Sequence, residues 1–160
     1  MPNCQGNYKT QGVANKLLSF SMTSFLPLNE LLKYDNERLV TQYALKHPER
    51  SLEQSRQLWK DLLGWMWLTQ FRKTQGKATH LFGPLLRLDD LWHFFILNTR
   101  DYCEFCEQYW ESYFHHDIEA HGEEHQISPD ELADFLEDAF EFLGEAWIDR
   151  YFQPLFTEEN

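Results

Sequence analysis

The sequence predicts an all-α fold, a single-domain bundle of about five helices. Apolar residues recur at three- and four-residue spacing in several segments, and no segment shows the sustained two-residue alternation of a strand. The 160 residues are 42% hydrophobic and 16% aromatic, which suits a compact core and excludes disorder throughout the chain. We expect a flexible polar leader over residues 1–24 and one helical domain over residues 25–156.

The first two predicted helices differ in character. Residues 28–46 have near-helical apolar spacing, and Asp35 or Asn36 can break this segment into two pieces by capping the second. Residues 51–72 begin with Ser51, which has a glutamine three residues later, the spacing of a capping box. A broad apolar surface follows, so we expect this second helix to be central.

Three further helices follow a connection of low helical tendency at residues 73–87. Asp89 or Asp90 is expected to cap the third helix, and Thr99 the fourth. The last helix begins at Ser128, where an N-cap serine, a proline and a capping-box glutamate follow one another. Apolar residues then recur at helical spacing as far as Trp147, with acidic residues on the opposite face.

Charge is divided unevenly along the chain. The formal net charge is -12, but residues 1–100 hold 13 basic and 8 acidic side chains, whereas residues 101–160 hold 1 and 18. This acidity argues against nucleic acid and anionic membrane surfaces as ligands, and no apolar run approaches the roughly 20 residues of a membrane span. The partners we expect are metal cations or a basic protein, although a charged face often serves solubility alone.

Three cysteines, Cys4, Cys103 and Cys106, are too few for a disulfide framework, and we expect a cytoplasmic protein. Cys103 and Cys106 have the C-x-x-C spacing of redox sites. However, the acidic residues around them would raise the thiol pKa, so thioredoxin-like activity is not expected. His121 to His125 matches an H-x-x-E-H zinc-protease pattern, but Gly122 interrupts the helix that this pattern needs.

A distinctive series of residues lies between residues 89 and 116. It consists of an Asp, a Trp-His pair, Ile-Leu-x-Thr, a Tyr, a Cys and a His-His pair, at Asp89, Trp92-His93, Ile96-Leu97, Thr99, Tyr102, Cys106 and His115-His116. In order and spacing this resembles a small bacterial family of unknown function, related to the repeated domains of plant glycine-rich domain proteins. The resemblance covers about residues 50–118 and implies no particular reaction.

Three positions depart from that family pattern. Phe95 stands where a second histidine often follows the Trp-His pair. Glu111 stands at a common glycine, and Ile118 at a common proline. If the histidines of the family bind a metal, this chain therefore lacks one candidate ligand.

The same segment carries the candidate metal ligands. Asp89 and His93 share a helix face, and a helical hairpin could bring Cys106 and either His115 or His116 to them. Carboxylate, imidazole and thiolate suit Zn or another divalent transition metal. In the alternative interpretation Asp89 caps its helix, His93 makes a structural hydrogen bond, and Cys106 packs as a small apolar residue.

Two classes of function remain open. The first is a small metal-binding domain, and the second is an acidic interaction or inhibitor module whose C-terminal helix binds a basic protein. No phosphate-binding loop, dinucleotide fingerprint or serine nucleophile elbow is present, so no nucleotide or flavin is expected. An enzyme, with Asp89 and His93 as a general-base pair, is the less favoured possibility.

Overall fold

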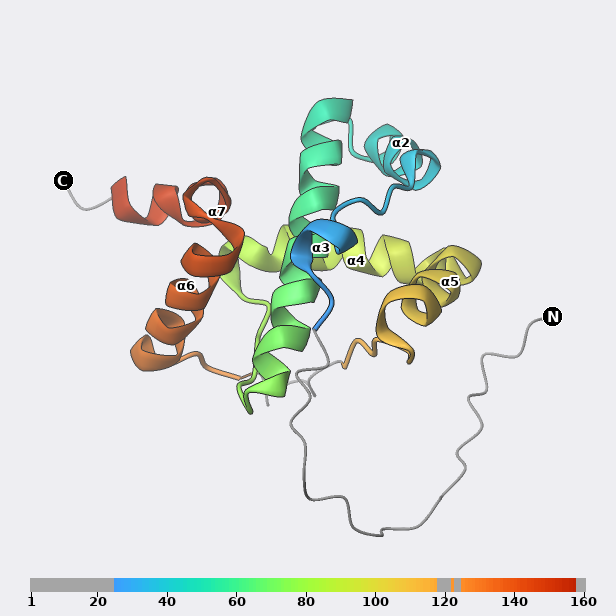
Figure 1. Ribbon diagram of the computed structural model, residues 1–160. Helices are drawn as coiled ribbons and strands as arrows, with labels where there is room; N and C mark the ends of the chain where they lie inside the picture. Colours follow the sequence, from blue (N-terminus) through green and yellow to red (C-terminus); the bar gives the residue numbers. More distant parts are fainter. Residues whose placement is uncertain (1–24, 118–121, 123–124, 158–160) are drawn as a thin grey trace, which may run out of the picture.

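The computed structural model describes residues 25–117, 122 and 125–157 (Figure 1). Over these residues the chain forms helices, turns and loops without a strand, which confirms the all-α prediction. The predicted leader at residues 1–24 lies outside the described residues. Among the helices of the described ranges, none has the length and apolar character needed to cross a membrane.

The described residues form seven α-helices and one short 3-10 helix, so the expected number of about five was too low. In chain order they are α1 (Leu28–Leu31), α2 (Glu37–Lys46), α3 (Leu52–Thr74), η1 (Gly83–Leu85), α4 (Leu86–Leu97), α5 (Thr99–Trp110), α6 (Pro129–Leu143) and α7 (Glu145–Thr157).

Two breaks account for the additional helices. Asn36 ends the first break by accepting a hydrogen bond from the Leu39 amide at 3.1 Å, so it caps α2 as expected. Gly144 makes the second break, because its φ of 88° is a backbone angle that residues other than glycine rarely adopt. The apolar spacing continues across Gly144, and for this reason a single final helix was predicted.

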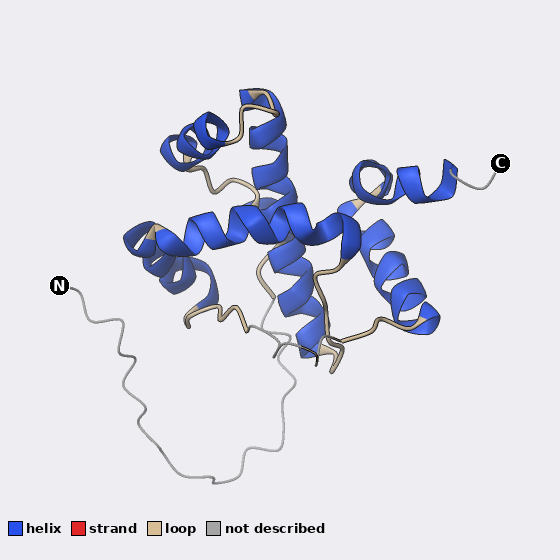
Figure 2. Cartoon of the chain, turned by 180° about the vertical axis from the view of Figure 1, so that it is seen from behind, coloured by secondary structure: helices blue, strands red, loops and turns tan. Residues whose placement is uncertain are grey.

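Helix α3 is the centre of the molecule, as its apolar surface predicted. It contacts α1, α2, α4 and α6, and α4 crosses it in the views from the front and from behind (Figures 1 and 2). The predicted capping boxes at Ser51 and Ser128 are both present, so α3 and α6 begin where the sequence indicated. Helices α6 and α7 pack against each other and lie to the left of α3 in Figure 1, whereas α2 and α5 lie to its right.

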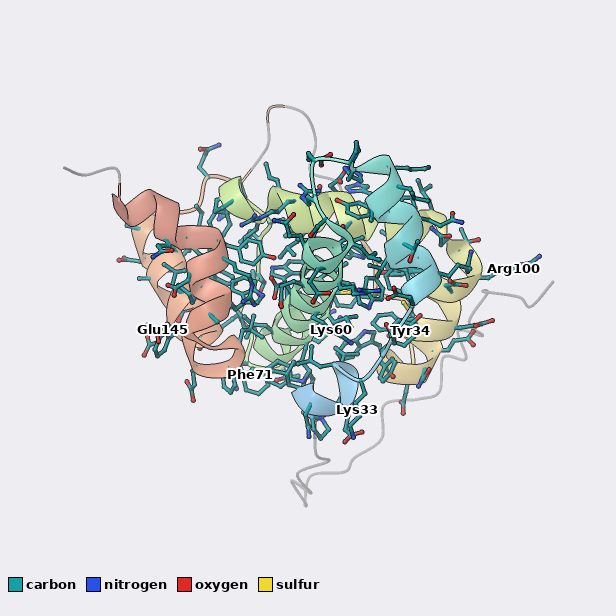
Figure 3. All side chains as sticks on the ribbon, turned by 90° about the horizontal axis from the view of Figure 1, so that it is seen from above. Lys33, Tyr34, Lys60, Phe71, Arg100 and Glu145 are labelled. Atoms are coloured by element: carbon teal, nitrogen blue, oxygen red, sulfur yellow. The ribbon has the colours of Figure 1, made fainter. Side chains whose placement is uncertain are left out.

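Polar side chains of α3 attach the outer segments to it. Lys60 Nζ donates hydrogen bonds to the carbonyl oxygens of Leu32 and Tyr34 at 2.8 and 3.1 Å (Figure 3). The buried Asp61 carboxylate accepts hydrogen bonds from Arg150 and from the Tyr151 hydroxyl, which join α7 to α3. These contacts satisfy polar groups that burial would otherwise leave unpaired.

The expected caps of the third and fourth helices were wrong. Helix α4 begins at Leu86, directly after the 3-10 turn at Gly83–Leu85, and Asp89 therefore lies within its first turn. Helix α5 begins at Thr99 itself, and Asn98 occupies the N-cap position. Because Asp89 has no capping role, its carboxylate is available for contacts with other side chains.

Candidate metal centre

Asp89, His93 and His116 come together on the outer side of α4. Each offers one metal-ligand atom, and these atoms all lie within 4.8 Å of one another. Asp89 Oδ1 lies 2.5 Å from His116 Nε2, and Asp89 Oδ2 lies 3.4 Å from His93 Nδ1. His93 Nδ1 is also 2.8 Å from the Asp89 carbonyl oxygen. The two imidazole centroids are 4.4 Å apart, so a carboxylate and two imidazoles form one compact group.

The local sequence explains how α4 presents two of these residues. Asp89 and His93 are four residues apart and thus lie one turn apart on the same helix face. The other faces of α4 carry Leu88, Leu91 and Phe95, all fully buried in the core. The opposite side of the helix is therefore left for Asp89, 25% exposed, and His93, 49% exposed.

His116 reaches this face from the segment that follows α5. Its ring centroid lies 4.2 Å from that of Trp92, and its side chain is only 15% exposed. His116 Nδ1 is buried and has no hydrogen-bond partner among the described residues. A neutral ring in this position therefore carries its hydrogen on Nε2, which donates to Asp89.

Buried hydrogen bonds hold the segment that carries His116. The Tyr102 hydroxyl donates to the Phe114 carbonyl oxygen and accepts from Trp92 Nε1 at 3.1 Å. The Phe114 amide donates to Cys106 Sγ at 3.5 Å. Both backbone groups of Phe114 are thus bound to α5, two residues before His116.

The structure brings together three of the five predicted ligands. Cys106 lies on the buried face of α5, is 1% exposed, and does not belong to the group around Asp89. His115 is exposed and packs on the Tyr113 ring with centroids 4.9 Å apart. Asp90, the neighbour of Asp89, accepts a hydrogen bond from the Tyr43 hydroxyl at 2.7 Å and does not belong to the group.

Two of the three departures from the resembled family pattern lie within the residues that the structure describes. Phe95 is fully buried, so a histidine at that position would point into the core and away from Asp89. Glu111 follows α5 with φ at 56°, a left-handed conformation that glycine adopts most easily. Ile118 lies outside the described residues.

A second group of possible ligands was not predicted. His80, His125 and Glu131 also offer ligand atoms that all lie within 4.8 Å of one another. His125 belongs to the H-x-x-E-H pattern, but it lies in an irregular segment; His121, Glu123 and Glu124 are outside the described residues. No spacing in the sequence links His80 to His125, because tertiary structure alone brings them together.

One comparison with known proteins gives a family. Residues 30–130 match the family model described as UCP032817-like, so the chain belongs to this family. Neither a curated protein nor a solved structure matches the sequence. The family description names no ligand and no reaction, and the function must be inferred from the geometry above.

Proposed function

We propose that this member of the UCP032817-like family is a helical domain that binds a divalent transition metal ion, preferably zinc, through Asp89, His93 and His116. The observation that carries the proposal is the convergence of three ligand-type side chains from α4 and the segment after α5. Two imidazoles and one carboxylate are a common zinc ligand set, and three protein ligands leave a fourth position for water.

The present distances suit such a site after a small adjustment. Tetrahedral bonds of about 2.1 Å place two ligand atoms about 3.4 Å apart. Asp89 Oδ2 and His93 Nδ1 have this separation already, but Nδ1 must first give up its hydrogen bond to the Asp89 carbonyl oxygen. Asp89 Oδ1 and His116 Nε2, at 2.5 Å, must move apart by about 1 Å. His93 is half exposed and can rotate, so an ion could enter from its side.

The competing interpretation is a structural hydrogen-bond cluster in which Asp89 accepts a hydrogen bond from each histidine, at its carboxylate from His116 and at its carbonyl oxygen from His93. A metal would take the place of these hydrogen bonds, with each imidazole hydrogen moved to the other ring nitrogen, and the two interpretations therefore predict different metal contents. Elemental analysis of the full chain, after chelation and reloading with Zn²⁺, should show that His116→Ala loses one metal equivalent relative to the unaltered protein.

His115→Ala is the matched control, because His115 neighbours His116 in sequence, is exposed and lies outside the group. We expect it to keep the full metal content. Equal metal content in the unaltered protein, His116→Ala and His93→Ala would reject the proposed centre.

We propose as a second candidate an interaction surface on α6 for a basic protein. The exposed residues Glu137 and Glu141 flank Phe140, a large apolar side chain that is 57% exposed. Asp134 and Asp138 do not contribute to this surface, since both pair with Arg72 and Lys77. A phenylalanine between two exposed glutamates offers both apolar contact and charge complementarity.

Tagged protein recovered from cells tests this second candidate. Partners bound through the surface should be lost with Phe140→Ala combined with Glu137→Lys, and kept with Asp149→Lys on α7. Identical partners in both variants would exclude the surface. Loss of metal and loss of partner are separate measurements, so each candidate function can fail alone.

A further inference from the structure

We propose that His80, His125 and Glu131 form a second metal-ion site, for zinc or a similar divalent transition metal. It shares no residue with the Asp89 group. His80 comes from the connection after α3, His125 from the segment ahead of α6, and Glu131 from the first turn of α6. An ion here would join the connection to the beginning of α6.

The three side chains are already in contact. His125 Nε2 lies 2.9 Å from Glu131 Oε1, and the His80 and His125 rings stack with centroids 4.1 Å apart and planes at 14°. The exposed fraction is 37% for the His125 side chain and 44% for Glu131. His125 can therefore turn its ligand atom toward a point shared with Glu131 and His80 without disturbing the core.

The capping box of α6 fixes the position of the Glu131 carboxylate. Glu131 Oε2 accepts a hydrogen bond from the Ser128 amide at 2.8 Å, while Glu131 Oε1 stays directed at His125. One Glu131 oxygen thus holds the side chain in place, and the other remains directed at His125 as a ligand atom.

A cleft of about 150 Å³ adjoins the group, and His80 and Glu131 are among its lining residues. Its volume exceeds the roughly 30 Å³ that a water molecule occupies, so it has room for a hydrated fourth position. The cleft also contains Arg72 and Lys77, which would repel a cation. Asp134 and Asp138 pair with both, and their charges offset this repulsion.

Two imidazoles and a glutamate form a ligand set that catalytic zinc sites use, with an open position for water. None of this depends on the Asp89 centre. The two sites therefore predict two metal equivalents for the full chain, each removable by its own substitutions.

Titration of the chelated full chain with Co²⁺, followed by visible absorption and by elemental analysis, tests the proposal. We expect two equivalents in the unaltered protein and one in His80→Ala/His125→Ala. Glu131→Gln should weaken the second equivalent at least about tenfold. Because glutamine also forms a capping box, this variant should keep the helix content and melting temperature of the metal-free protein. Glu137→Gln on the same helix is the matched control and should bind both equivalents.

The outcomes separate this site from the Asp89 centre. A single equivalent that His116→Ala removes, and that His80→Ala/His125→Ala and Glu131→Gln leave unchanged, overturns the second site and leaves the first standing. A single equivalent with the reverse pattern overturns the first and supports the second. No bound metal in the unaltered protein overturns both.

Discussion

The Tyr102 hydroxyl donates a hydrogen bond to the backbone carbonyl oxygen of Phe114, and both residues are buried. Burial raises the pKa of the phenol, so Tyr102 stays protonated as a donor at neutral pH. Through this bond, helix α5 holds the segment in which His116 follows two residues later. Tyr102 therefore helps to place His116 against Asp89, although its described hydrogen bonds go to Phe114 and Trp92 and not to either of these two residues.

Tyr102→Phe should destabilise the protein by about 1–3 kcal/mol, because the Phe114 carbonyl and Trp92 Nε1 lose a buried partner. Urea unfolding measures this difference. Tyr109→Phe on the same helix is the control, since Tyr109 is partly exposed, and should change stability by less than about 0.5 kcal/mol. Equal effects of the two substitutions would contradict the anchoring role of Tyr102.

Cys106→Ser should keep every metal equivalent of the unaltered protein. The thiol accepts a hydrogen bond from the Phe114 amide, which a serine hydroxyl can also do, and it stands outside the group around Asp89. Elemental analysis after Zn²⁺ loading is the measurement. Loss of one equivalent with the helix content unchanged would make Cys106 a ligand, as the sequence suggested.

Glu111→Gly should stabilise the protein by about 0.5–1 kcal/mol. Relief of the left-handed conformation contributes about 1–2 kcal/mol, and the greater freedom of glycine in the unfolded chain offsets part of it. Glu107→Gly, at an exposed position inside α5, should instead destabilise by about 1 kcal/mol. Urea midpoints at unchanged m-value distinguish the two, and effects of the same sign would be inconsistent with the geometry at Glu111.

Asp61→Ala should destabilise the protein by about 1–3 kcal/mol, since it leaves the buried Tyr151 hydroxyl without its partner and removes the partner of Arg150 at the junction of α3 and α7. Asp149→Ala, exposed on α7, serves as the control and should remain within about 0.5 kcal/mol. Thermal and urea unfolding provide the comparison. A loss below about 1 kcal/mol for Asp61→Ala would show that this ion pair is not a main support of α7.

The pairing of α6 with α3 should weaken in acid. Hydrogen bonds from Lys77, and then Arg72, lower the pKa of Asp134 below its ordinary value of 3.8. The stabilisation is therefore complete above the unfolded-state pKa and is lost as pH falls through the lower, folded-state pKa. Asp134→Asn should be less stable than the unaltered protein at pH 7, and this difference should disappear once the pH has fallen through the folded-state pKa of Asp134. A difference in urea midpoint that persists in strong acid would assign the effect to another cause; Glu137→Gln is the control.

Much of the fold could be read from local patterns. The capping boxes at Ser51 and Ser128 were predicted and are present, because each involves residues only three positions apart. The centrality of α3 followed from its broad apolar surface. The break at Gly144 was missed because helical apolar spacing continues beyond it, and only the backbone angle at this glycine shows the end of α6.

For the candidate ligands too, sequence spacing predicted one part of the group and tertiary packing decided the rest. Helical periodicity alone placed Asp89 and His93 on one face, since four residues make about one turn. Tertiary packing selected His116 over Cys106 and His115, because α5 turns its thiol into the core while buried hydrogen bonds to Phe114 bring the next segment back over α4. Packing also joined His80 to His125 and Glu131. Contacts within one helix follow from residue spacing, whereas contacts between distant segments depend on how their apolar faces are buried, and that is a property of the whole chain.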